Sequence, residues 1–191
     1  MIKLAYAVLI FTVNDAQSFK SSFANFTYGM YSVKKFMNVS SGTEIWTYNT
    51  TRPTNFNCFL DEVYNITETE VLFSRSYKIN GKWSMANKIG TFRFKNPGLM
   101  IVGEEGVLAD RNEKLVYADN NYTCGIFRVK YRVGLKDNNA DLGRSSWYDL
   151  RFRTTGLPPK PTKPAKECME NFQQKRQSGH LVYFHNCTLL E

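Results

Sequence analysis

Short runs of β-branched and aromatic residues recur along most of the chain, and clusters of Gly, Pro, Asn and Ser separate them. Such runs predict β-strands, because branched and ring side chains pack well on a pleated surface. No helical pattern alternates with them, so the pattern predicts an all-β fold of about eight strands with short connections. The expected extended segments are residues 31–38, 44–51, 58–65, 70–79, 82–95, 99–104, 113–119, 124–133 and 147–154.

A meander of short antiparallel strands has two open sheet edges that it must protect. The Asn80-Gly81 pair is a strong signal for a tight hairpin, which joins neighbouring antiparallel strands. Closing such a sheet into a barrel removes both edges. We therefore expect an eight-stranded antiparallel barrel.

Alternation along residues 124–133 assigns the faces of one strand. Phe127, Val129 and Tyr131 lie on one face, whereas Cys124 and Arg128 lie on the other. The charged face has to meet water, so the face with the rings is expected to point into the barrel. Cys124 then points outward, where a segment outside the barrel can bond to it.

The C-terminal part differs in pattern from the strands. A proline-rich stretch at 158–164 favours an extended, stiff linker. Residues 165–177 are helix formers, with Cys168 and Phe172 four apart on one face. Gly179 ends this helix, and a short strand is expected at residues 181–185. The pattern predicts a C-terminal helix packed outside the barrel.

The sequence has four cysteines, an even number that predicts two disulfides in an oxidising compartment, and three pairings are open. We prefer Cys124 with Cys168, because an outer helix can reach an outward-facing cysteine, and Cys58 with Cys187, because the final strand can reach Cys58. There is no C-x-x-C pair and there are only two histidines, so we expect no metal site. The sequence carries no serine-elbow, phosphate-loop or zinc-protease motif, so an enzyme is not expected.

The N-terminus resembles a secretory signal. Lys3 precedes an apolar stretch at 4–13, and Ala16-Gln17-Ser18 is a small-x-small cleavage site. A buried first strand is the alternative interpretation. We expect a signal peptide at 1–18, a single domain at 19–191, secretion, and no membrane span, because the apolar run is too short. Export fits six Asn-x-Ser/Thr triplets that predict a glycoprotein: Asn25, Asn38, Asn49, Asn65, Asn121 and Asn186.

Composition narrows the range of partners. Aromatic residues make up 15% of the 191 residues, which suits strands and also suits a lined cavity. The net charge is +8, but the basic residues are scattered, without an Arg/Lys block interleaved with stacking rings. A solvated basic surface explains the charge more simply than nucleic-acid binding does.

Several stretches of the chain match one known family: Ile45–Thr51 ahead of Cys58, Tyr117–Asn121 ahead of Cys124, Trp147–Leu150, Glu167-Cys168 with Phe172, and Cys187. In these residues the chain resembles the tick salivary lipocalins, the histamine-binding family of blood-feeding arthropods. The resemblance implies an eight-stranded lipocalin barrel with an outer C-terminal helix, secretion into saliva, and capture of histamine, serotonin or leukotrienes. It also implies bridging of the first cysteine with the last and of the second with the third. The common Gly-x-Trp signature is missing, and Gly29-Met30-Tyr31 stands nearest to it.

Capturing an amine requires buried carboxylates and aromatic faces. Glu113 shares an expected strand face with Tyr117, and Asp149 shares one with Trp147. Asp61 is a weaker third candidate. Alternatively, Glu113, which begins its expected strand, is a solvated charge at the rim of the barrel. Asp149 is, in the same way, the ion-pair partner of an arginine on its own face, Arg151.

Arg75 gives an opposite indication, because it aligns with the apolar residues of its strand face. An inward arginine suits a ligand with a carboxylate, such as a leukotriene or fatty acid. It also suits a structural pair with Asp149 or Glu113, which is the interpretation we favour. Tyr131 faces inward with its strand, and Phe92 and Phe94 share a face with Gly90, so these rings are expected to line or fill the cavity.

The sequence thus leads to three hypotheses. The first is a secreted lipocalin that sequesters a small host amine, the second is a scavenger of an anionic lipid mediator, and the third is a protein-binding immune modulator on a barrel scaffold. For the first two we expect a monomer with a small-molecule ligand, no cofactor, and no nucleic acid or membrane as partner.

Overall fold

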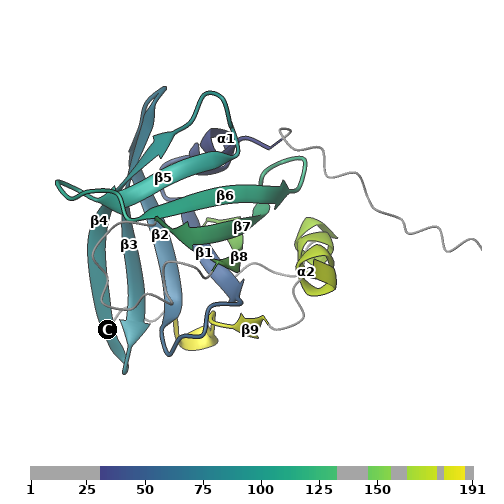
Figure 1. The fold of residues 1–191 in the computed structure, drawn as a ribbon. Helices are drawn as coiled ribbons and strands as arrows, with labels where there is room; N and C mark the ends of the chain where they lie inside the picture. The colour runs from purple at the N-terminus through teal and green to yellow at the C-terminus, as the bar shows by residue number, and fades with distance from the viewer. Residues whose placement is uncertain (1–30, 133–145, 156–162, 176–178, 188–191) are drawn as a thin grey trace, which may run out of the picture.

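The computed structural model describes residues 31–132, 146–155, 163–175 and 179–187. Eight antiparallel strands form a closed barrel, because β1 pairs with β8 on one side and with β2 on the other (Figure 1). This confirms the predicted fold class. The strands are β1 (Glu44–Thr50), β2 (Asn57–Ile66), β3 (Glu70–Ile79), β4 (Lys82–Phe92), β5 (Leu99–Glu104), β6 (Arg111–Ala118), β7 (Cys124–Tyr131) and β8 (Ser146–Thr154).

A short helix, α1 (Val33–Met37), occupies the segment 31–38 that we expected to be extended. The Ser32 hydroxyl accepts a hydrogen bond from a first-turn backbone N–H, as an N-cap does. Val33, Phe36 and Met37 are fully buried. Their spacing is helical rather than alternating, which explains why the prediction of a strand here was wrong.

The apolar core lies inside the barrel and under α1. The Phe36 ring meets the Phe127 ring edge to face, with centroids 5.0 Å apart. A Cβ on Gly125 would lie 2.8 Å from both Leu115 and Phe36, so only glycine lets the helix approach β7 this closely. Helix α1 and this apolar cluster lie at the end of the barrel where β1 begins. The loop after β1 therefore lies at the opposite end.

The C-terminal segments pack outside the barrel. Helix α2 (Lys163–Lys175) lies beside β7 and β8 (Figure 1). The side chain of Phe172 is buried against residues of these strands. A short strand, β9 (His180–Leu181), pairs with the end of β1, and a 3₁₀ turn, η1 (His185–Cys187), follows. The outer helix is confirmed within two residues of its predicted bounds, whereas the final strand ends earlier than expected.

Two disulfides fix these outer segments to the wall. Cys124 bonds to Cys168 of α2, and Cys58 bonds to Cys187 of η1. The preferred pairing is therefore confirmed, and so is the outward direction of Cys124. None of the described helices is both long and apolar enough to cross a membrane.

Candidate functional site

Five charged side chains meet inside the barrel, and we call Asp61, Arg75, Glu113, Asp149 and Arg151 the ion network. Arg75 donates from Nε and Nη2 to the two oxygens of Asp61, both at 2.7 Å, and from Nη1 to Oε1 of Glu113 at 2.7 Å. Arg151 donates from Nη1 to Oε2 of Glu113 at 2.7 Å and from Nη2 to Oδ2 of Asp149 at 2.9 Å. Each carboxylate therefore faces a guanidinium group.

Strand alternation and register explain how these residues come together. Asp61 on β2 lies directly opposite Arg75 on β3, so the pair forms across neighbouring strands. Asp149 and Arg151 are two apart on β8 and share its inner face. Glu113 reaches the group from β6, on the far side of the interior, and the side chain is 0% exposed.

The network favours the charged forms of Glu113 and Arg75. Burial raises the pKa of Glu113, but the charges of Arg151 and Arg75 lower it by more, so this pKa lies far below its usual range. Burial lowers the pKa of Arg75, but Asp61 and Glu113 raise it further. Counted by formal charge, the three carboxylates and two guanidinium groups give the network a net charge of −1.

A cavity lies between the network and the end of the barrel opposite α1. Its volume is about 30 Å³, which holds about two water molecules. The Thr50 hydroxyl donates to Oδ1 of Asp149 at 2.7 Å beside it. The hollow that we expected is thus small, because the apolar cluster and the network fill most of the interior. Its lining residues are Thr47, Thr50, Arg52, Thr54, Phe59, Arg75, Arg111, Glu113, Val129, Trp147, Asp149 and Arg151.

Arginine and aromatic side chains form the outer rim of the cavity. The Arg52 guanidinium lies 5.0 Å from the centroid of the Trp147 ring and 5.8 Å from that of Phe56. Its Nη2 donates to the Tyr131 hydroxyl at 3.2 Å. Arg111 differs, because it is held by two hydrogen bonds to the carboxylate of its neighbour in the chain.

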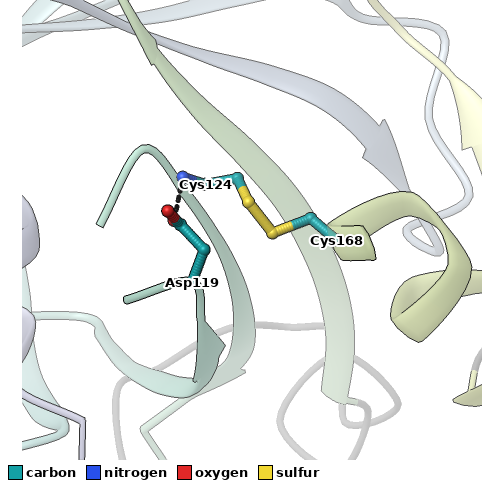
Figure 2. A group of neighbouring side chains, drawn as sticks. All are labelled: Asp119, Cys124 and Cys168. Carbon is teal, nitrogen blue, oxygen red and sulfur yellow. Dashed lines mark hydrogen bonds between the residues drawn. A yellow bond between two sulfur atoms is a disulfide. The ribbon is translucent and has the colours of Figure 1, made fainter. Parts of the chain in front are cut away.

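A second cluster with ligand-type atoms, Asp119, Cys124 and Cys168, lies outside the barrel (Figure 2). The two sulfur atoms are bonded to each other as a disulfide, so neither is a thiolate able to bind a metal. Asp119 accepts hydrogen bonds from the Cys124 and Asn121 backbone N–H groups and from the Thr123 hydroxyl. The cluster holds the turn between β6 and β7.

Neither protein-family models nor curated protein sequences give a match to this chain. Solved structures do. The AM182 serotonin complex has a TM-score of 0.59 at 16% identity, over 83% of this chain and 94% of that one. Japanin from Rhipicephalus appendiculatus bound to cholesterol has a TM-score of 0.50 at 13% identity, over 75% of this chain and 93% of that one. The siderocalin Ex-FABP has a TM-score of 0.51 at 10% identity, over 71% and 86%.

The chain has the lipocalin fold. Identities this low establish the fold alone, so the histamine-binding family remains a prediction. In this lipocalin fold, α1 covers one end of the barrel and the cavity lies toward the other.

Several candidate residues come together inside the lipocalin barrel. Asp61, Glu113 and Asp149 are buried, and the structural pair expected between Arg75 and Glu113 is present. The pair expected between Asp149 and its own strand neighbour is present as well. Trp147 lines the cavity, and the Tyr131 ring lies 5.2 Å from it.

Other candidates lie elsewhere. Tyr117 packs with the cluster around α2, because a bulge between Leu115 and Tyr117 reverses the alternation of β6. Phe94 is 83% exposed, since β4 ends before it. The inward placement of both was wrong. Phe92 packs against the apolar core, away from the cavity lining.

Sequence reasoning missed the role of Arg52 and gave Arg151 only one of its partners. Arg52 follows a strand and precedes a proline, so no periodicity assigns its direction. Arg151 was expected to pair with its strand neighbour alone, whereas it also binds Glu113 from another strand. Cross-barrel contacts of this kind depend on register, which the sequence pattern does not fix.

Proposed function

We propose that this chain is an extracellular carrier that captures a small aromatic amine, such as histamine or serotonin, and thereby removes a host inflammatory mediator. The net charge of −1 on the buried ion network, beside the cavity, is the observation that carries the proposal. Binding is at equilibrium, without turnover.

An unbalanced charge in a buried site favours a ligand of the opposite sign. Burial of a net charge is costly unless a partner neutralises it, and a monovalent cation would bring the sum to zero. Asp149 is the acid through which this would happen, because it lines the cavity and its side chain is the most exposed of the three network carboxylates.

The wall of the cavity suits the ring of such a ligand. Trp147 lines it beside Asp149, so an aromatic amine would meet a carboxylate and a π-face in one place. The solved AM182 structure is a complex with serotonin, and the shared fold supports a small-molecule ligand for this chain. Since the cavity has room for about two waters, side chains at the rim have to move when the ligand enters.

An anionic ligand, such as a leukotriene or fatty acid, is the second candidate. Four arginines line the cavity against two carboxylates. Nε of Arg151 is buried and finds no hydrogen-bond partner among the described residues. A carboxylate ligand would use these donors.

Titration calorimetry with serotonin on the wild type and on Asp149→Asn tests the first candidate. Loss of one charge-assisted contact weakens binding by about 10- to 100-fold. Glu62→Gln removes a carboxylate from the exposed face of β2 and serves as the control, with unchanged affinity expected. Equal affinity of Asp149→Asn and wild type would refute the proposal.

Export is part of the proposal. Two disulfides are consistent with an oxidising compartment. The expected signal at 1–18 and the triplet at Asn25 lie outside the described residues. Asn49 is half-buried, with its Oδ1 enclosed, so it is the least suited of the described triplets to carry a glycan. The four triplets with exposed asparagines are Asn38, Asn65, Asn121 and Asn186.

A further inference from the structure

We propose that the Arg52 side chain is a built-in occupant of the ligand's cation position, which an amine has to displace from the Trp147 ring. This inference rests on the proposed function, and it adds the residue that sets affinity and selectivity. Three observations support it: the position of the guanidinium, its balance of charge, and the small size of the cavity.

The first observation is geometric. The Arg52 guanidinium lies 5.0 Å from the Trp147 ring and is hydrogen-bonded to the Tyr131 hydroxyl at 3.2 Å. An organic cation of the ligand would use the same π-face and the same hydroxyl. The chain therefore already places a cation where an aromatic amine would bind.

The second observation concerns charge. Arg75 and Arg151 each bind carboxylates of the network, and Arg111 binds Asp110. Among the described residues, Arg52 has no carboxylate partner of its own; aromatic rings and a hydroxyl hold its guanidinium. Its charge brings the sum over the network and the rim to zero, which is the role assigned above to the ligand.

The third observation concerns space and attachment. The cavity of about 30 Å³ is too small for an aromatic amine unless a lining side chain leaves. Arg52 is half-buried at the rim, and a single side-chain hydrogen bond to protein is found for it among the described residues. Its backbone is held in place, because its N–H donates to the Thr50 hydroxyl, which in turn donates to Asp149. The movement thus involves the side chain, while the backbone stays tied to the acid.

The site should therefore discriminate between cationic ligands. A ligand binds only if its ring and charge replace the contacts of Arg52 and also reach Asp149. Aliphatic amines, which lack the ring, are disfavoured. Weakening the resident cation should tighten binding, which is the opposite of what a ligand-contacting residue would show.

Calorimetric titration with tryptamine at neutral pH compares the wild type with Arg52→Ala. Arg52→Ala should bind about tenfold more tightly, since a cation–π contact and a hydrogen bond no longer compete. Arg128→Ala on the exposed outer face of β7 removes the same charge and should match the wild type. Arg52→Lys keeps the charge without the planar group and should fall between the two.

A second readout needs no ligand. With 5-fluorotryptophan in the full chain, ¹⁹F NMR follows each tryptophan, and Trp147→Phe assigns the relevant signal. Arg52→Ala should increase the relaxation of the Trp147 signal by a soluble paramagnet, and Arg128→Ala should not. Unchanged relaxation would overturn the inference, because Arg52 would then not cover the ring.

The outcomes separate this inference from the proposed function. Tryptamine binding by the wild type with equal or weaker binding by Arg52→Ala overturns the inference and leaves the amine proposal in place. No tryptamine binding by either protein, with Trp147 newly accessible in Arg52→Ala, refutes the amine proposal and with it the displacement by an amine.

Discussion

Glu113→Gln provides a direct test of whether the ion network is held together as the geometry implies. The Glu113 side chain is 0% exposed and accepts hydrogen bonds from Arg75 and Arg151, each at 2.7 Å. Glutamine keeps the shape but removes the charge and turns an N–H₂ group toward a guanidinium donor. Breaking a buried ion pair from one side costs about 3–5 kcal/mol, so we expect a loss of this size in the free energy of unfolding at pH 7.

The cost of Glu113→Gln in the free energy of unfolding should also depend on pH, in a direction that the pKa of Glu113 determines. The pKa of Glu113 lies far below its ordinary value of 4.5, so this carboxyl binds a proton more readily in the unfolded chain than in the folded one. Its contribution is therefore complete above about pH 4.5 and falls by about 1.4 kcal/mol for each pH unit below that. Between pH 7 and pH 3, the difference between wild type and Glu113→Gln should shrink by about 2 kcal/mol.

Urea unfolding followed by tryptophan fluorescence, with both disulfides oxidised, measures this difference at each pH. Glu62→Gln on the exposed face of β2 is the matched control and should stay within about 0.5 kcal/mol of the wild type. A cost for Glu113→Gln below about 1 kcal/mol at pH 7, or a cost that does not change down to pH 3, would refute the reasoning.

Two further changes test the disulfide and the helix packing that hold the barrel wall. Replacing both Cys124 and Cys168 by serine removes a bridge with a sequence separation of 44. Chain entropy predicts that the free energy of unfolding, measured in urea, falls by up to about 4 kcal/mol. An unchanged midpoint would contradict the stabilising role of this bridge. Phe36→Ala leaves a cavity between α1 and β7 and should lower the free energy of unfolding by about 3–5 kcal/mol. Phe94→Ala removes an exposed ring and should lower it by less than about 0.5 kcal/mol. Equal midpoints for these two variants would contradict the assigned burial.

Much of the fold could be predicted from the sequence, because polar and apolar residues alternate in any strand that has one solvent-exposed face and one buried face. Residues 124–133 show this, since the alternation correctly sent Cys124 outward to α2. Helix α1 was missed, because five residues are too short for a helical period to stand out against neighbouring strands.

The site was accessible only in part, since it depends on register and on loops. Alternation placed Asp61, Arg75 and Asp149 inside the barrel, but the bulge after Leu115 changed the direction of Tyr117. A bulge leaves no dependable trace in a single sequence. The position of Arg52 on the Trp147 ring follows from a loop between two strands, where no periodicity applies.

The central claim is that the cavity beside the ion network selects a cation. Calorimetry of the wild type with three indoles of matched shape tests it: tryptamine, uncharged 3-ethylindole and the anion indole-3-propionate. The account predicts the tightest binding for tryptamine, weaker binding for 3-ethylindole and the weakest for indole-3-propionate. Tightest binding of indole-3-propionate would contradict it and would assign the cavity arginines to the ligand.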